Sequence, residues 1–260
     1  MTILSDFSGG WDSEARLVDG RWVERRPRRP EVERQLCMET RLMPWLAPQL
    51  PLPVPVPHRL PGASLAVRHV LVPGGPVARP RARHGHGLGR FLRALHAVSP
   101  TGAVRHGAPS DREAARVRAT TADDFLARVV PLLPVELRAP GRALVEESTS
   151  CPAGRLAHGD LGPEHMLADG GVLSGVIDFG DAHIGDPAID LAWALHGTPR
   201  AFAAALAAEY GVTPELRARS LLWHRLGPWH EVTHGLDTED PATVRTGVAG
   251  VCHRLAAGTA

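Results

Sequence analysis

The chain has 260 residues, a formal net charge of +1, 43% hydrophobic residues and 22% charged residues. This length supports one large domain or two small lobes with real cores, and the composition is ordinary for a globular protein. The small net charge argues against nucleic-acid binding and against a polybasic membrane contact. The chain shows no signal-peptide pattern and no apolar run of membrane-spanning length, so we expect a cytoplasmic protein.

Two residue types are missing from the sequence. All 29 residues counted as Lys+Arg are arginines, and asparagine does not occur. The three cysteines, Cys37, Cys151 and Cys252, lie far apart and lack Cys-x-x-Cys spacing. We therefore expect free thiols and no zinc site.

The N-terminal segment predicts a β-hairpin. Asp19-Gly20 is a typical two-residue turn, and residues 21–26 form the returning strand. Gly9 and Gly10, ahead of the turn, permit a close approach of the backbone to a ligand.

Residues 30–46 predict an amphipathic helix. Val32, Leu36 and Met43 recur at helical spacing on one face, and Glu39 falls on the same face. An acidic residue there either reaches solvent at the edge of the face or pairs with a cation.

A proline-rich, extended connector at 51–57 and a strand at 65–72 follow. The Pro-Gly-Gly-Pro segment at 73–76 ends this strand and predicts a hinge. We expect an N-terminal lobe over 1–72 and a C-terminal lobe over 73–260.

The C-terminal lobe is mostly helical by pattern. Gly227-Pro228 is expected to break one helix, residues 81–87 to form a basic loop or helix lead-in, and residues 99–110 to be looser. The helical patterns are 88–98, 109–147, two within 185–210, 221–236 and 241–257.

Two segments carry the chemistry, the first acidic segment at 156–167 and the second acidic segment at 175–181. Residues 156–167 place Asp160 on a turn after a short apolar run, with His165 five residues later, and Asp178 ends the β-like run 172–177. In phosphoryl transfer, one carboxylate orients the hydroxyl nucleophile and other groups hold the Mg²⁺ that bridges the nucleotide phosphates. The pattern predicts Asp160 in the first role, and His165 with Asp178 as metal ligands.

The strings His158-Gly-Asp160 and Ile177-Asp-Phe-Gly180 resemble the aminoglycoside phosphotransferase family, choline-kinase-like relatives of the protein kinases. The family patterns are His-Gly-Asp-x-x-x-x-Asn and Ile-Asp-[Phe/Trp]-[Gly/Ser/Glu], so His165 stands where Asn is usual. The resemblance implies a bilobal, protein-kinase-like α+β fold. The small N-lobe would hold an antiparallel sheet plus a helix, and the larger C-lobe would be mostly helical.

The resemblance also implies a nucleotide site for ATP or GTP. The glycine pair would lie in a loop covering the nucleotide, Arg25 would stand in for the phosphate-contacting lysine, and Glu39 would pair with it. Backbone groups near Val70 and Val72 would meet the purine. The plainer interpretation of Arg25 is one of five solvated arginines between 21 and 29.

Several neighbouring residues receive structural roles from the same resemblance. His158 is expected to brace the catalytic turn, and Asp190 is expected to hydrogen-bond the backbone of that turn. Asp186 is expected to cap a helix, which its position before Pro187 also explains. His96 is expected to pack.

The acceptor site is less defined by the sequence. Members of the family bind cationic antibiotics in an acidic cleft between C-lobe helices, so Asp181 and Glu231 are candidate substrate contacts. For Glu231, a solvated helix face explains the same sequence.

Together these expectations describe a Mg²⁺-dependent phosphotransferase that acts as a monomer. It would move the γ-phosphoryl group of ATP or GTP to a hydroxyl of a small cationic antibiotic, with an aminoglycoside first. Macrolide, tuberactinomycin or metabolite acceptors remain open. Because Lys and Asn are both absent, a pseudo-kinase that binds nucleotide without turnover is the alternative from another class.

Overall fold

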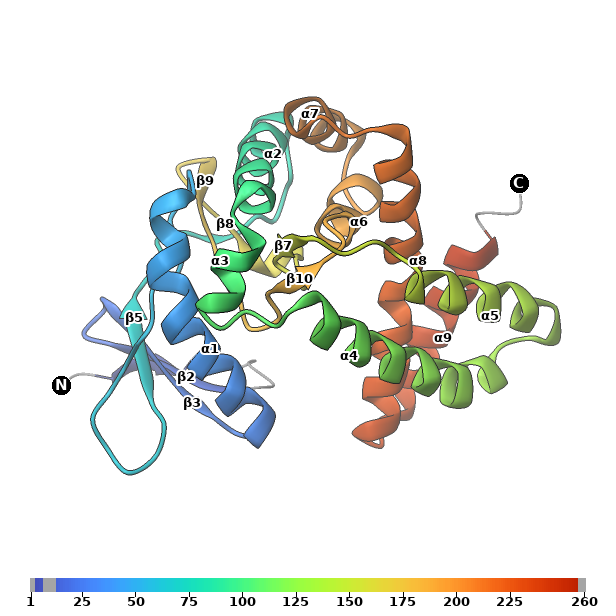
Figure 1. The fold of residues 1–260 in the computed structure, drawn as a ribbon, viewed down its shortest axis with the longest axis horizontal. Helices are drawn as coiled ribbons and strands as arrows, with labels where there is room; N and C mark the ends of the chain where they lie inside the picture. The colour runs from blue at the N-terminus through green and yellow to red at the C-terminus, as the bar shows by residue number, and fades with distance from the viewer. Residues whose placement is uncertain (1–2, 7–12, 257–260) are drawn as a thin grey trace.

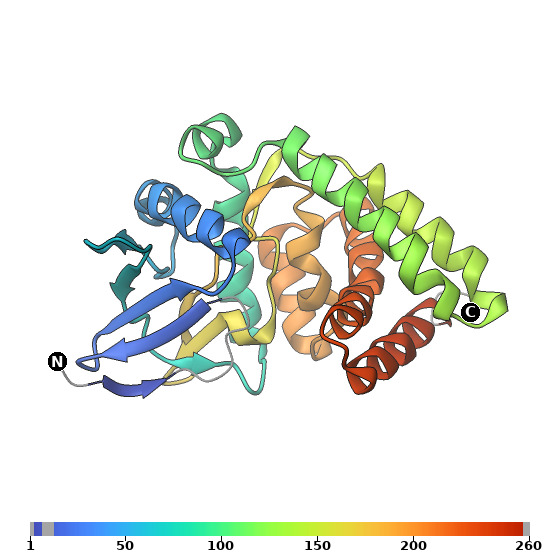
Figure 2. The same cartoon turned by 90° about the horizontal axis from the view of Figure 1, so that it is seen from below.

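The computed structural model describes residues 3–6 and 13–256. Figure 1 shows a smaller N-terminal lobe, built on a sheet and one long helix, beside a larger lobe that is mostly helical. Seen from below, the sheet lies to one side of the helical bulk (Figure 2). This is the kinase-like α+β arrangement predicted from the sequence.

The N-terminal sheet is antiparallel and has the strand order β1-β2-β3-β5-β4. The predicted hairpin at Asp19-Gly20 joins β2 to β3, but its loop also takes in Arg21, because Val18 pairs with Trp22. Asp19 and Gly20 have positive φ angles of 53° and 63°. The strands are β1 (Ile3–Asp6), β2 (Ser13–Val18), β3 (Trp22–Pro27), β4 (His58–Arg59) and β5 (Val67–Val70).

Helix α1 (Pro30–Leu46) has the bounds that the sequence predicts. Its apolar face is buried, with Leu36 and Met43 fully inaccessible to solvent. Pro30 suits the first turn, where its missing N–H leaves no hydrogen bond unmade. A short 3₁₀ helix, Ala47–Gln49, continues the chain. Burial of this face fixes α1 against the sheet and carries Glu39 inside.

The segment expected as a hinge also forms an edge strand. β6 (Gly75–Pro76) pairs with β8 (Met166–Asp169), which pairs with β9 (Val172–Val176). Gly74 has φ of 102°, and a Cβ there would lie 2.5 Å from the Ala168 carbonyl oxygen, so glycine is required. The connection between the lobes is therefore held by the sheet that carries the second acidic segment.

Helices make up the rest of the C-terminal lobe, with α2 packed on α7 and α6 on α8. A small two-stranded sheet, β7 (Arg155–Ala157) with β10 (His183–Gly185), lies beside them. The helices are α2 (Ala82–Ala97), α3 (Pro100–Arg105), α4 (Asp111–Asp124), α5 (Val135–Thr149), α6 (Ala188–His196), α7 (Arg200–Tyr210), α8 (Pro214–Asp237) and α9 (Pro241–Ala256). A π turn (Phe125–Val129) and 3₁₀ turns (Val130–Leu132 and Pro163–His165) complete the set.

Two helical regions differ from the sequence prediction near residues 81–110. Helix α2 begins at Ala82, because the Nδ1 atom of His84 accepts a hydrogen bond from the Arg81 N–H at 3.3 Å and caps the first turn. The segment expected to be loose contains α3, whose N-terminus is capped by the Ser99 hydroxyl.

Helix α8 is also continuous, where a break at Gly227-Pro228 was expected. A proline inside a helix leaves the carbonyl four residues earlier without its N–H donor. Here that carbonyl belongs to His224, and it accepts a hydrogen bond from the Arg254 guanidinium of α9. A donor from a neighbouring helix therefore replaces the missing bond.

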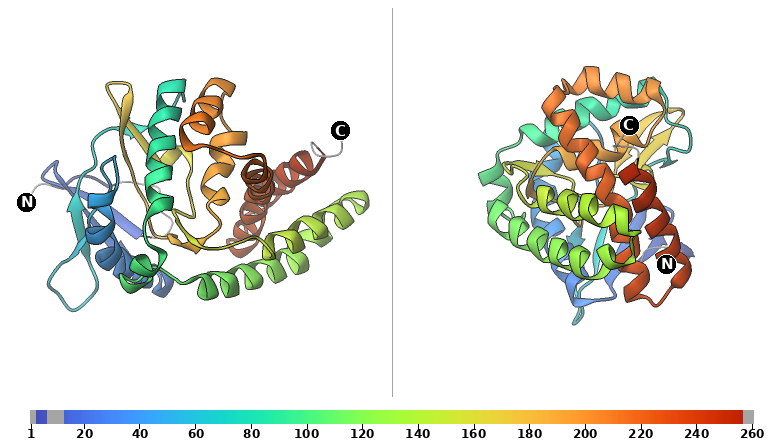
Figure 3. Two further views of the ribbon diagram at one scale, coloured as in Figure 1. Left: turned by 45° about the horizontal axis from the view of Figure 1, so that its top comes forward. Right: turned by 90° about the vertical axis from the view of Figure 1, so that its right-hand side faces the viewer.

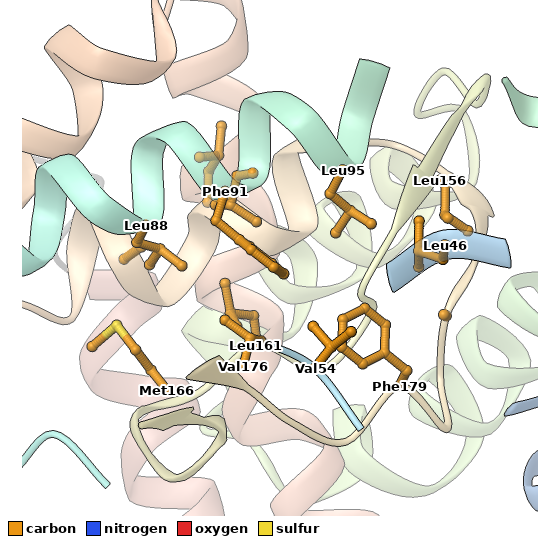
Figure 4. Packing of buried hydrophobic residues seen from close by; sticks show 14 of the residues in the cluster. Leu46, Val54, Leu88, Phe91, Leu95, Leu156, Leu161, Met166, Val176 and Phe179 are labelled. Carbon is orange, nitrogen blue, oxygen red and sulfur yellow. The ribbon is translucent and has the colours of Figure 1, made fainter. Parts of the chain in front are cut away.

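Two hydrophobic clusters fill the larger lobe, and the main one also includes Leu42, Met43 and Leu46 of α1. The main core lies under α2 and includes Leu88, Phe91, Met166 and Phe179, whose packing is shown in Figure 4. A second cluster joins α4 and α5 to α8 and α9 around the fully buried Trp229. Figure 3 shows these four helices side by side at the end of the molecule away from the sheet.

None of the helices in the described ranges is both long enough and apolar enough to cross a membrane.

Candidate active site

Asp160 lies on the turn that follows β7. Gly159 before it has φ of 90°, and a Cβ at that position would come within 2.3 Å of the Asp181 carbonyl oxygen. Glycine is therefore required, and the close approach brings the two acidic segments together. The Asp160 side chain is 62% exposed. Its carboxylate is open to a ligand while its backbone is tightly held.

A buried carboxylate holds this turn in place. Asp190, on α6, accepts hydrogen bonds from the N–H groups of His158 at 2.7 Å and Gly159 at 2.9 Å. His96 of α2 adds a contact of 2.9 Å from Nε2, and its Nδ1 lies 2.8 Å from the Tyr210 hydroxyl. Burial opposes the charged form, but the His96 hydrogen bond and nearby charges lower the pKa of Asp190.

His158 connects the two acidic segments. Its Nε2 lies 3.0 Å from the Ile177 carbonyl oxygen, and its Nδ1 accepts the Asp160 N–H at 3.3 Å. The first contact requires a proton on Nε2 and the second an unprotonated Nδ1, so both fit one neutral tautomer. His158 and Asp190 thus make the bracing contacts expected of them. His96, expected only to pack, takes part in the buried hydrogen-bond network.

His165 presents one ring nitrogen to Asp178. Its Nδ1 donates to the Asp160 carbonyl oxygen at 2.7 Å, so in the neutral ring Nε2 carries a free lone pair. That Nε2 lies 3.7 Å from Oδ2 of Asp178. His165 and Asp178 are therefore close enough to contribute ligands to one cation site.

The rest of the coordination shell would come from elsewhere. Across the described residues, no cluster of three or more His, Cys, Asp or Glu side chains could hold a metal alone. Mg²⁺ usually takes one or two protein ligands and completes its shell with phosphate oxygens and water. Asp178 also has φ of 67°, an uncommon angle for a side-chain-bearing residue that costs on the order of 1 kcal/mol. The fold thus maintains strain at this carboxylate.

A cation lies beside the same carboxylate. Arg25 of β3 donates two hydrogen bonds of 3.1 Å to Glu39 of α1, and its Nη2 lies 3.7 Å from Oδ1 of Asp178. Ser13 accepts a third bond from Arg25, at 3.2 Å. The expected pairing of Arg25 with Glu39 is present. Burial raises the pKa of Glu39 to about 7, against the opposing effect of Arg25.

The residues expected near the purine lie where the lobes join. Val70 is 51% exposed at the end of β5, and Val72 is buried against Gly175 of β9. Gly9 and Gly10 lie outside the described residues. The structure therefore places Val70 and Val72 at the lobe junction, and their contacts with a nucleotide stay predictions.

A cavity of about 1430 Å³ opens beside Asp160. Its walls come from α1, α4, the two acidic segments, α6, α8 and α9, and they include Asp181. Glu231 is not one of the lining residues, although His230 beside it is. Of the two carboxylates expected to contact the acceptor, only Asp181 borders this space.

Sequence reasoning missed the contribution of α1 to the cavity. Gln35 donates a hydrogen bond of 3.1 Å to Asp181 and so joins the N-terminal helix to the second acidic segment. The cavity-facing positions 31, 34, 35, 38 and 41 recur at helical spacing. Apart from the buried Met38 this stripe is polar and visible in the sequence, but nothing local indicates what it faces.

Solved structures of other proteins share the overall fold of this chain. The chain is similar to APH(2″)-IIIa in a complex with GDP and kanamycin, with a TM-score of 0.86 at 24% identity, over 99% of this chain and 95% of that one. It is also similar to apo macrolide 2′-phosphotransferase MphH from Brachybacterium faecium. The TM-score there is 0.73 at 26% identity, over 96% and 91% of the two chains.

Two further matches concern the sequence. A homoserine kinase from Methylobacterium nodulans is 35% identical over 123 residues, which is 47% of this chain and 38% of that kinase. The chain thus spans well under half the length of this curated relative. The family model described as "Phosphotransferase enzyme family" matches residues 3–229. With most of its length matched, the chain belongs to this phosphotransferase family.

Proposed function

We propose that the protein transfers the γ-phosphoryl group of ATP or GTP to a hydroxyl group of a small molecule. The observation that carries this proposal is the position of His165 between two carboxylates. One ring nitrogen binds the backbone of Asp160, and the other faces Asp178 at 3.7 Å. This arrangement sets a metal ligand pair next to an open carboxylate, as phosphoryl transfer demands.

Asp160 is the group that meets the acceptor. Its exposed carboxylate accepts a hydrogen bond from the acceptor hydroxyl and takes the proton as the hydroxyl oxygen attacks the γ-phosphorus. The new P–O bond forms as the bond to the β-phosphate oxygen breaks, and the nucleoside diphosphate leaves. Asp190 and His158 hold the turn, so the carboxylate is positioned before the substrate arrives.

His165 and Asp178 would hold the Mg²⁺, which supplies charge neutralisation on the phosphate oxygens. Arg25 takes the place of a lysine and contacts the phosphates, and its guanidinium group is held in position by the carboxylate of Glu39. We assign Gly9 and Gly10 to the nucleotide-covering loop and the backbone near Val70 and Val72 to the purine. Arg25 at this position argues for turnover and against a pseudo-kinase, because a phosphate-binding cation is supplied without lysine.

The acceptor is proposed as a small antibiotic, which makes the reaction a resistance mechanism. An aminoglycoside is supported by the kanamycin bound in a structural neighbour, and Asp181 is its first candidate contact. Glu231 remains a second candidate, from outside the cavity wall. A macrolide is supported by the similarity to a macrolide phosphotransferase, and homoserine by the partial match to its kinase.

A phosphate-transfer panel tests the proposal. Purified protein is incubated with Mg²⁺, with ATP or GTP and with each acceptor class, and the product mass is measured. We expect one phosphoryl group to appear on at least one acceptor with the wild type and on none with Asp160→Ala. Turnover that is equal in the two proteins would reject Asp160 as the catalytic carboxylate.

A further inference from the structure

The cavity beside Asp160 does not have the acidic lining that the family resemblance implies. It is lined by as many arginines as carboxylates; these charged residues are Arg34, Arg41, Arg118, Arg254, Glu31, Asp160, Asp181 and Asp186. A polycationic acceptor carries several ammonium groups and needs an excess of carboxylates to replace their hydration. This lining offers no such excess.

One of the carboxylates is already engaged. Asp186 is buried, accepts a hydrogen bond from the Trp223 indole at 3.0 Å and pairs with Arg219 at 3.1 Å. Its charge is neutralised by the protein, so it gives little attraction to an ammonium group in the cavity. Asp181 accepts a hydrogen bond from Gln35, and Asp160 and the exposed Glu31 at the start of α1 also line the cavity.

The two arginines of α1 differ from Asp186, because neither is paired with a nearby carboxylate among the described residues. Arg34 and Arg41 lie two turns apart on the cavity-facing stripe of the helix, with Met38 between them. Within the described ranges, neither guanidinium has a carboxylate within 4.0 Å, unlike Arg25 on the nearby strand. The Arg41 guanidinium lies against Gly107 at the cavity wall. Two uncompensated positive charges therefore face the space that an acceptor would fill.

Another part of the wall combines aromatic rings with the arginines Arg118 and Arg254. The Arg118 guanidinium lies 5.7 Å from the ring centre of Trp223, and Trp193 and Phe125 line the same space. Burial lowers the pKa of His224 to about 4, and the positive charge of Arg254 lowers it further. Burial also lowers the pKa of His230. Both rings are thus neutral near pH 7 and can hydrogen-bond hydroxyl groups without attracting cations.

We propose that this cavity takes an acceptor with a largely apolar body and at most one positive charge, and that Arg34 and Arg41 exclude polycations. The inference rests on the proposed phosphotransferase function and, among the acceptors proposed for it, favours a macrolide over an aminoglycoside. Like charges that face a ligand act mainly on affinity, so they are expected to change KM for a polycation more than kcat.

The test compares two acceptors of opposite character, kanamycin as the polycation and a macrolide as the apolar monoamine. Phosphate transfer and calorimetric binding are measured for the wild type and for Arg34→Glu with Arg41→Glu. We expect the wild type to favour the macrolide by about 100-fold or more in kcat/KM. The double variant should lower this preference by about tenfold, through KM for kanamycin, and added salt should shrink the effect.

A matched control carries the same change of charge elsewhere. Arg112→Glu with Arg142→Glu alters two exposed arginines that do not line the cavity, and its preference should equal that of the wild type. If the glutamate double variant does not fold, Arg34→Gln with Arg41→Gln should move the preference in the same direction by a smaller factor.

The outcomes separate the inference from the function beneath it. A wild type that prefers kanamycin, a preference unchanged by either cavity variant, or a macrolide that does not bind overturns the inference while leaving phosphoryl transfer intact. Absence of both Mg²⁺-dependent nucleotide binding and transfer to any acceptor overturns the proposed function, and the inference with it.

Discussion

The guanidinium of Arg25 is fixed by the carboxylate of Glu39 through two hydrogen bonds of 3.1 Å. The pair joins strand β3 to helix α1, and only 1% of the Glu39 side chain is exposed. A buried carboxylate that loses its cation is left with an uncompensated charge, so the two side chains should act as a unit.

The first prediction concerns this pair in catalysis. Arg25→Ala and Glu39→Ala should each lower kcat/KM for the nucleotide by at least tenfold, and the double variant should be no worse than the more impaired single one. Steady-state kinetics of the four proteins complete the cycle. Arg26→Ala, at the exposed neighbouring position, is the matched control and should retain wild-type kinetics. Additive losses would mean that the two residues act independently.

The second prediction concerns pH. Because burial raises the pKa of Glu39 from 4.5 to about 7, the folded state binds a proton that the unfolded state releases. The stabilisation from this proton is fully present below pH 4.5 and is lost as the pH rises through about 7. Urea unfolding at a series of pH values should show this decline, and Glu39→Gln should flatten it. An equal slope in both proteins would refute the raised pKa.

The third prediction concerns the metal ligands. Asp178→Ala should abolish the Mg²⁺ dependence of nucleotide binding, since Asp178 supplies the oxygen ligand that Mg²⁺ prefers over the imidazole nitrogen of His165. His165→Asn should retain it, because an amide oxygen can take the place of the imidazole nitrogen. Calorimetry of nucleotide binding with and without Mg²⁺ distinguishes the two variants. A folded His165→Asn protein without activity would indicate that His165 does more than ligate the cation.

The fourth prediction concerns the support of the catalytic turn. Asp190→Ala removes the acceptor for two backbone N–H groups and for His96, so the free energy of unfolding should fall by about 3 kcal/mol. Transfer should fall as well, because Asp160 loses its fixed position. Asp123→Ala, an exposed change on α4, is the control and should cost less than about 0.5 kcal/mol. Similar losses in the two variants would contradict the role of Asp190.

How far the sequence predicts this fold depends on the range of the interactions involved. Helix α1 could be placed residue by residue, since its apolar spacing and Pro30 are local signals. The break expected at Gly227-Pro228 was wrong, because the bond that rescues the helix comes from Arg254 on α9. A hydrogen-bond donor so far along the chain cannot be recognised from the sequence around the proline.

The same distinction applies to the site. Asp160, His165 and Asp178 stand in short strings whose spacing already indicates phosphoryl-transfer chemistry, and the fold brings them together. The acceptor cavity has no such string. Its charge depends on which face of α1 meets the C-terminal lobe, and on the pairing of Asp186 with Arg219. The expectation of an acidic cleft came from family resemblance, and the lining of this cavity differs from it.

The central claim is that Asp160 serves a nucleotide-dependent transfer to a hydroxyl group. Its most direct test follows phosphate from labelled ATP and GTP to the acceptor, with wild type and Asp160→Ala at equal nucleotide saturation. We expect the variant to bind Mg²⁺-nucleotide normally and to transfer at least about 100-fold more slowly, the usual loss of a positioned base. A variant that binds nucleotide and keeps more than about a tenth of the wild-type rate would contradict the account.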